Sequence, residues 1–239
     1  MVKGEQFLLP FLTFPIFMSD CEYITSVLSG WVTERRLGRI EEILTKRTRY
    51  LTVALEDIYQ SQNASAVLRT CECFGVQDVH IIENDNPYNI NPMVLKGSDK
   101  WLSIHRHNQS ENNTAGVVHM LKSEVYRIIA TSLCERGVLL NDFDVERGKC
   151  AIVFGNEHQG VSEYMMEQAD ECLKIPMCGF TQSLNISVAA GIIISQLMEK
   201  IRNGTVVWQL TDHEKDILRA EWLQCSVKSK VDELYYCRR

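Results

Sequence analysis

The sequence predicts an α/β fold, in which helices cover both faces of a mostly parallel sheet. Between residues 51 and 177, short runs rich in β-branched residues alternate with segments whose apolar residues recur at helical spacing. The strand runs are short and mostly apolar, as expected for strands that are buried on both faces. With 239 residues, the chain suits one main core with additional segments at its ends.

Two different segments precede this core. Residues 1–17 include an apolar run, residues 7–17, which contains two prolines and lacks the cleavage pattern of a signal peptide, so we expect a start-site extension or a flexible arm. Residues 18–50 are predicted to form a helical extension, because apolar residues recur at helical spacing over residues 23–31 and again over residues 37–44.

Five buried strands are predicted within residues 51–203, the expected α/β domain. They cover residues 52–55, 79–82, 126–130, 151–154 and 173–175. Helices are predicted between them, for example over residues 64–74 and 161–169. The carboxyl ends of parallel strands share one edge of the sheet, and ligands of such sheets bind at that edge.

A long apolar helix is predicted over residues 184–201. It is hydrophobic all round, which predicts burial against the sheet or against a second subunit. Asn203 and Gly204 end this pattern. Residues 204–239 are then expected to form an amphipathic C-terminal helical extension.

The composition narrows the class of protein. No stretch is long and apolar enough for a bilayer, and we expect no membrane partner. The nine cysteines are an odd number without CxxC spacing, which favours free thiols in a reducing cytoplasm over a disulfide scaffold or a zinc site. The net charge of −6 argues against attraction of the whole molecule to nucleic acid, so charge has to be considered segment by segment.

Basic residues concentrate in the two predicted extensions. The candidate cluster consists of Arg35, Arg36, Arg39, Lys46, Arg47 and Arg49, with Lys228 and Lys230 near the C-terminus. Such a cluster is either a solvated face or a surface that binds RNA phosphates. The pattern by itself leaves both interpretations open.

Three polar segments follow the predicted strands at residues 52–55, 151–154 and 173–175. The first runs from Asn63 to Arg69, and we expect Asn63 to cap the helix that begins there. This segment is either part of a functional site or simply a capped helix that carries a surface arginine, Arg69.

The second polar segment, residues 154–162, has two glycines at the GxxxxG spacing of a phosphate loop. Val161 and Ser162 stand where a nucleoside-triphosphatase requires Lys and Ser or Thr, so binding of ATP or GTP is not supported. What remains is a loop rich in backbone polar groups that bears one carboxylate, Glu157.

The third polar segment, residues 175–190, leads from a strand into the long apolar helix. Pro176 and Gly179 force an irregular backbone, which leaves main-chain donors and acceptors available to a ligand. Ser183 and Asn185 lie at the entrance of the helix, where a cap for Ser183 is the simpler interpretation.

Together, the segments NASAVLR, FGNEHQGVS and IPMCGFTQSLNISVAA resemble the three motifs of the SpoU branch of the SPOUT methyltransferases, in the same order. The resemblance spans residues 51–201, and the flanking helices and residues 97–102 are similar to the TrmH type of this branch. It implies a deep C-terminal trefoil knot, the cofactor S-adenosyl-L-methionine, and a homodimer whose active site lies at the subunit interface. The residues that it assigns to the cofactor are Thr131, Gly155, Asn156, Ile175, Met177 and Leu184.

The resemblance also implies the reaction, which is methyl transfer to a ribose 2′-oxygen of RNA. Arg69 matches the catalytic arginine of the family. A guanidinium stays protonated up to about pH 12, so a direct role as base is chemically demanding. Arg69 is instead expected to orient phosphate and hydroxyl while Glu157 or water accepts the proton, with Asn63, Ser183 and Asn185 fixing the geometry.

The flanking helices favour a tRNA substrate, and the resemblance implies the guanosine at position 18 in the D-loop. Ribosomal RNA and a tRNA wobble nucleoside are the alternatives within the branch. A non-catalytic knotted RNA-binding protein is the alternative outside it. A metal enzyme that uses His105 and His107 is a weak further reading, because no partner ligand stands near them in the sequence, and we expect no metal.

Overall fold

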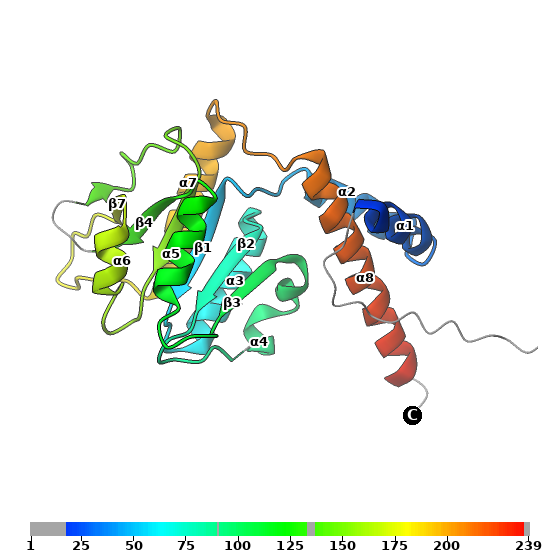
Figure 1. Cartoon of the computed structure of the whole chain (residues 1–239), viewed down its shortest axis with the longest axis horizontal. Coiled ribbons are helices and arrows are strands. Elements are labelled where there is room, and N and C mark those ends of the chain that lie inside the picture. The colour runs from blue at the N-terminus through cyan, green and yellow to red at the C-terminus, as the bar shows by residue number, and fades with distance from the viewer. Residues whose placement is uncertain (1–17, 90, 133–136, 237–239) are drawn as a thin grey trace, which may run out of the picture. The chain divides into compact units, whose positions relative to one another are not determined.

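The computed structural model describes residues 18–89, 91–132 and 137–236 (Figure 1). The predicted arm at residues 1–17 lies outside the described residues. The described chain divides into two compact units: a larger one, Glu41–Thr211, and a smaller one formed by residues up to Ile40 and from Asp212 onward. Residues 41–50 and 204–211, which flank the predicted α/β domain, therefore belong to the larger unit.

The larger unit contains a seven-stranded sheet in which all described pairings are parallel. Its order is β3-β2-β1-β6-β4-β7-β5. The strands are β1 (Leu51–Glu56), β2 (Asp78–Ile82), β3 (Ser103–His107), β4 (Arg127–Thr131), β5 (Val138–Leu139), β6 (Cys150–Phe154) and β7 (Glu171–Lys174). The five predicted strands are confirmed. The two that were not predicted are the edge strands β3 and β5, one of them polar and half-exposed and the other only two residues long.

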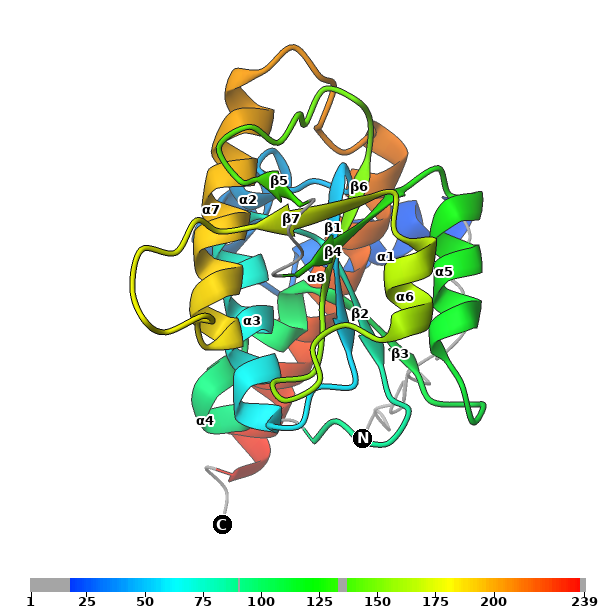
Figure 2. The same cartoon turned by 90° about the vertical axis from the view of Figure 1, so that its left-hand side faces the viewer.

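Helices cover both faces of this sheet, as predicted. Figure 2 shows α3 (Ser61–Phe74) and α7 (Ile186–Asn203) on one face, and α5 (Thr114–Ser123) and α6 (Glu163–Gln168) on the other. The short α4 (Pro92–Leu95) and the 3-10 helix Ser98–Trp101 contact α3.

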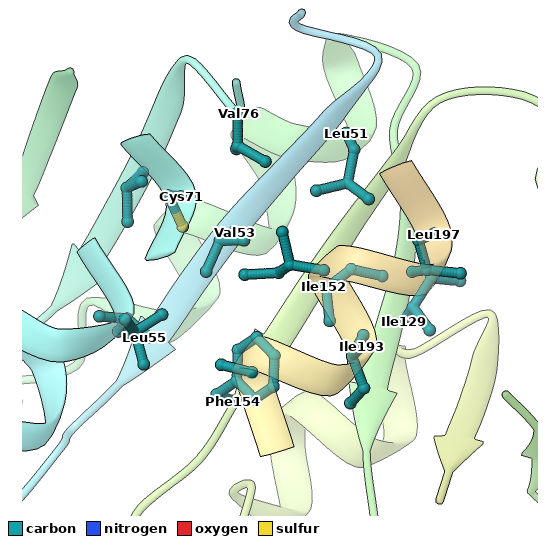
Figure 3. Close-up of a cluster of buried hydrophobic side chains, with 14 of the residues drawn as sticks. Leu51, Val53, Leu55, Cys71, Val76, Ile129, Ile152, Phe154, Ile193 and Leu197 are labelled. Carbon is teal, nitrogen blue, oxygen red and sulfur yellow. The ribbon is translucent and has the colours of Figure 1, made fainter. Parts of the chain in front are cut away.

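Apolar residues of neighbouring strands and of two helices form the main core (Figure 3). Val53 of β1 and Ile152 of β6 are in register and fully buried. They pack in one cluster with Ile193 and Leu197 of α7. The long apolar helix is therefore buried on one side by the sheet. Because consecutive side chains of β1 and β6 point into the cores on opposite faces, these strands are buried along their whole length and mostly apolar.

In the smaller unit, α1 (Met18–Ser29) contacts α8 (Asp212–Tyr236). Leu218, Trp222 and Leu223 are buried residues of α8. Helix α2 (Glu34–Leu44) runs across the boundary between the units. Across the described ranges, no helix has both the length and the apolarity needed to cross a membrane.

Candidate functional site

The three polar segments lie at the carboxyl edge of the sheet. They follow β1, β6 and β7, which together with β4 are four consecutive strands in the sheet order. Thr131 is the last residue of β4 and is in register with Leu173 of β7. Segments whose residues lie up to 122 positions apart in the chain, such as Asn63 and Asn185, are thus brought to one edge, where ligands of parallel sheets bind.

The N-terminus of α3 is held by a carboxylate from the loop after β6. Glu157 accepts hydrogen bonds from the backbone N–H of Tyr59 through Oε2 at 2.9 Å and from that of Gln60 through Oε1 at 3.2 Å. The helix begins at Ser61 with Gln60 at the N-cap position. The prediction that Asn63 caps this helix is therefore wrong, because Asn63 lies within the first turn and Gln60 occupies the N-cap position.

Asn63 connects the three polar segments. Its Nδ2 donates to Glu157 Oε1 at 2.8 Å, and its Oδ1 accepts from Asn185 Nδ2 at 3.2 Å. Asn185 is the N-cap residue of α7, where its Oδ1 accepts from the backbone N–H of Ser187 at 2.9 Å. The residue that caps this helix is thus Asn185 and not Ser183.

The carboxylate of Glu157 is stabilised in its charged form. Burial raises the pKa of Glu157, but hydrogen bonds from Asn63 and from backbone N–H groups, including those of Tyr59 and Gln60, outweigh burial and lower the pKa overall. A carboxylate with a lowered pKa binds a proton less readily. The geometry suits Glu157 better for orienting its donors than for removing a proton.

The loop at residues 155–162 is closed by its own backbone. Asn156 and Gly160 exchange two N–H to O hydrogen bonds of 2.8 Å, and the Asn156 side chain also accepts from the N–H of His158 at 2.9 Å. A Cβ added at Gly155 would overlap the backbone of Gly160 and Val161. Only glycine fits at position 155 without moving this loop.

The six residues that were assigned to the cofactor differ in exposure. Thr131 is half-buried, and its hydroxyl donates to the Val153 carbonyl at 2.9 Å. Gly155, Asn156 and Ile175 are also half-buried. Met177 and Leu184 lie in residues 176–185, all of which are exposed. Within one chain, the six residues lie at the carboxyl edge of the sheet, two of them in the exposed loop.

Arg69 and Ser183 stand apart from the hydrogen-bonded network. Arg69 is exposed, and the one described hydrogen bond of its side chain joins Nη1 to the Val94 carbonyl at 3.4 Å. Arg69 lies six residues after Asn63 on the same helix, which is about 1.7 turns further along. Ser183 lies in the exposed loop. The described part of the chain therefore joins Asn63, Glu157 and Asn185 but not these two residues.

The basic residues fall into different environments. Arg35, Arg36, Arg39 and Lys46 are exposed, and Lys46 pairs with Glu42 at 2.6 Å. Arg49 is about three quarters buried and pairs with Asp78 at 2.8 Å. The side chains of Lys228 and Lys230 lie outside the described residues.

Arg47 is removed from the predicted RNA-binding set. Its side chain is 1% exposed, donates to Glu72 at 3.0 Å and donates to the Val76 carbonyl at 3.3 Å. Burial lowers the pKa of Arg47, and the Glu72 carboxylate counteracts this effect. Residue type and spacing do not distinguish this buried arginine from its exposed neighbours, because its partners come from α3 and from the chain that follows it.

We expect Arg47→Ala to destabilise the protein and leave its affinity for RNA unchanged. The predicted loss is about 2 kcal/mol in the free energy of unfolding, less than for a fully buried pair because Glu72 is about a quarter exposed. Urea unfolding and tRNA titration measure the two effects. The control, Lys46→Ala, removes an exposed cation and should do the opposite, weakening tRNA binding with a change in stability within about 0.5 kcal/mol. Weaker tRNA binding by a fully folded Arg47→Ala protein contradicts the assignment.

Three histidines gather on β2 and β3. His80 is 5% exposed, its Nδ1 lies 3.2 Å from His107 Nε2, and its ring stacks on His105 at 4.8 Å between centroids. His105 Nε2 is 3.4 Å from Asp78 Oδ1. Within the described ranges, no group of three His, Cys, Asp or Glu side chains is arranged to hold a metal ion.

This histidine cluster predicts a loss of stability in mild acid. Burial, then His105 and His107, lower the pKa of His80 to about 3, against about 6.5 in an unfolded chain. Below pH 6.5 the unfolded state therefore binds more protons, and stability falls as pH decreases. We expect His80 to account for a loss of about 1.5 kcal/mol between pH 6.5 and 5. Urea unfolding of His80→Gln should show a shallower pH dependence than wild type, and an unchanged slope would contradict the assignment to His80.

Comparison with known proteins agrees with this arrangement. The profile of the SpoU rRNA Methylase family matches residues 50–195, which is more than half of the chain and contains all three polar segments. The chain belongs to this family. The resemblance to SpoU methylases that the three motifs predicted is thereby confirmed.

Individual SpoU methylases match beyond the family region. The chain is 42% identical over 203 residues to a tRNA (guanosine(18)-2'-O)-methyltransferase of Borreliella burgdorferi, which covers 85% of this chain and 91% of that protein. It is 37% identical to the enzyme of the same name from Thermus thermophilus, over 80% of this chain and 97% of that one. A crystal structure of the Aquifex aeolicus TrmH/SpoU tRNA modifying enzyme has a TM-score of 0.72 at 32% identity, covering 84% and 98% of the two chains.

Proposed function

We propose that this protein transfers a methyl group from S-adenosyl-L-methionine to the ribose 2′-oxygen of guanosine 18 in the D-loop of tRNA. The observation that carries the proposal is the hydrogen-bonded set Asn63, Glu157 and Asn185, which joins all three family motifs at the carboxyl edge of the sheet. The choice of tRNA is supported by relatives named for this reaction, since two of them match 80% or more of the chain.

The residues at the ends of β4, β6 and β7 suit a nucleoside cofactor. They offer the Thr131 hydroxyl, backbone groups around Gly155 and Asn156, and the apolar side chains of Ile175 and Met177. When bound, S-adenosyl-L-methionine supplies an electrophilic methyl group. The protein's own contribution is to hold the ribose oxygen in line with that group and to permit loss of its proton.

In this proposal Arg69 contacts the RNA, and Glu157 has a positioning role. The exposed guanidinium of Arg69 is able to donate two parallel hydrogen bonds to a phosphate. Glu157 holds Asn63 and the first turn of α3, and its lowered pKa leaves water as the better proton acceptor. Ser183 is assigned to the RNA side of the site because it lies in the exposed loop.

We also propose that the active form is a homodimer. Residues 176–185 of the third motif are all exposed, and Phe180, Met177 and Leu184 are apolar residues among them. A second copy that covers this loop would bury these side chains next to the residues assigned to the cofactor. We further propose the trefoil knot of the family, which the position of β4 between the later strands β6 and β7 supports.

The test is incubation of the protein with methyl-labelled cofactor and unmodified tRNA transcript, followed by mapping of the methylated ribose. Label at guanosine 18, absent from a transcript whose ribose at that position is 2′-deoxy, is the expected result. Label at the wobble nucleoside, or only in a ribosomal RNA fragment, would assign one of the other substrates of the branch. Calorimetry without any cofactor binding would favour a non-catalytic RNA-binding protein.

A further inference from the structure

The last residue of β1 and the residue after it, Glu56 and Asp57, are two acidic residues at the same edge of the sheet. The side chain of Glu56 is 2% exposed, although an isolated buried carboxylate is strongly unfavourable. Asp57 has a φ of 53°, a left-handed conformation that Asp adopts more readily than most residues. The hydrogen-bond partners of the two residues explain both the burial of Glu56 and the backbone conformation of Asp57.

Glu56 holds the far end of the 155–162 loop. Its Oε2 accepts from the backbone N–H of Ser162 at 2.9 Å, and its Oε1 accepts from the Ser162 hydroxyl at 2.7 Å. Oε1 also accepts from the hydroxyl of Thr114, the first residue of α5, at 2.8 Å. Three hydrogen bonds offset the burial of this carboxylate.

Asp57 holds the near end of the same loop. Its carbonyl oxygen accepts from Asn156 Nδ2 at 2.9 Å. Its carboxylate Oδ1 accepts from three consecutive backbone N–H groups, those of residues 84–86, at 2.8 to 3.0 Å. The left-handed backbone of Asp57 thus serves two loops, one after β2 and one after β6, which flank β1 in the sheet.

The two acidic residues are also connected through the neighbouring loops. Asn84 donates its backbone N–H to Asp57 at 3.0 Å and its Nδ2 to Thr114 Oγ1 at 3.0 Å. Thr114 donates in turn to Glu56. Glu56, Thr114, Asn84 and Asp57 therefore form a closed ring, so displacement of one carboxylate disturbs the partners of the other.

We propose that Glu56 and Asp57 are positioning residues that clamp both ends of the 155–162 loop to the end of β1. The loop carries Asn156, assigned to the cofactor, and Glu157, which binds the N–H groups of Tyr59 and Gln60 just before α3 and the side chain of Asn63 within it. The 155–162 loop and the start of α3 are then held in a fixed arrangement before any ligand binds. Loss of the clamp weakens cofactor binding, because the loop must be ordered as the cofactor binds. This inference rests on the proposed function only for the identity of the cofactor.

Hydrogen exchange of the protein without ligand tests the clamp directly. In Asp57→Gly, which permits the same backbone conformation but lacks the carboxylate, we expect exchange at the amides of Asn156 and Gly160 to accelerate at least about tenfold. In Glu56→Gln, the amide of Ser162 should respond similarly. Asp57→Asn keeps an oxygen acceptor and tolerates a positive φ, so its exchange should stay within about threefold of wild type.

Glu83→Gln is the matched control. Glu83 is also a buried carboxylate just after a strand, but its carboxylate binds Arg106, Asn108 and the N–H of Tyr88 rather than the 155–162 loop. Its replacement should destabilise the protein without selective exchange at Asn156 or Gly160. Equal acceleration in Glu83→Gln, or wild-type exchange in both clamp variants, overturns the proposal.

Calorimetry and kinetics give the functional readout. For Asp57→Gly, the expected result is at least a tenfold increase in the Kd and KM for S-adenosyl-L-methionine, with kcat at saturating cofactor within about threefold of wild type. A fall in kcat with unchanged affinity would overturn the positioning role. If wild type does not bind this cofactor, the proposed function fails, while the exchange data still decide whether the clamp exists.

Discussion

Replacement of Arg69 by alanine is expected to lower the single-turnover rate of tRNA methylation about a thousandfold, with cofactor affinity within about twofold of wild type. The side chain is exposed and makes one long hydrogen bond to the Val94 carbonyl, so its removal disturbs little of the folded chain. A guanidinium that contacts the phosphate and the reacting ribose acts mainly in the transition state, where loss of a charged donor costs about two to three orders of magnitude in rate.

Two further variants make this prediction specific. Arg69→Lys keeps the charge but loses the planar pair of donors, and a partial rate, at least about tenfold below wild type, is expected. Arg147 is another exposed arginine of the larger unit, where it pairs with Glu171, and Arg147→Ala should retain the wild-type rate. Near-normal turnover in both Arg69 variants would exclude this residue from catalysis.

Gly155→Ala is the second substitution for which a large effect is expected. The new Cβ would overlap the backbone of Gly160 and Val161, which is bonded back to Asn156 and cannot move without opening the loop. We expect cofactor affinity to fall at least about a hundredfold, and stability to fall by about 1–3 kcal/mol through overpacking. Calorimetry and urea unfolding measure the two quantities.

Gly116→Ala is the control for this substitution. Gly116 lies within α5, and nothing lies within 4 Å of an added Cβ there. Because alanine is the better helix former, this change should raise stability by about 0.5–1 kcal/mol and leave cofactor affinity unchanged. Cofactor binding of Gly155→Ala at wild-type strength would show that the closed loop is not part of the site.

Local pattern predicted the inner strands and the main helices, because these segments bury apolar side chains whatever their neighbours are. It failed at the sheet edges. The alternating His105 and His107 of β3 are polar, since one side of an edge strand is partly open, and β5 is too short to carry a pattern. The start of α3 was also misplaced, because Gln60 and not Asn63 is its N-cap residue, and the N–H groups of Tyr59 and Gln60 bind Glu157, a residue almost a hundred positions later.

By itself, the sequence determined the α/β fold, the three ordered motifs and their family, since alternating hydrophobicity and short motifs are local properties. The tertiary structure alone decided which side chains meet. It buried Arg47 against Glu72 and separated Arg69 from the set of Asn63, Glu157 and Asn185. It also gave Glu56 and Asp57 their partners in two different loops. Hydrogen bonds between distant segments depend on how the strands are ordered in the sheet, and no local stretch of residues determines that order.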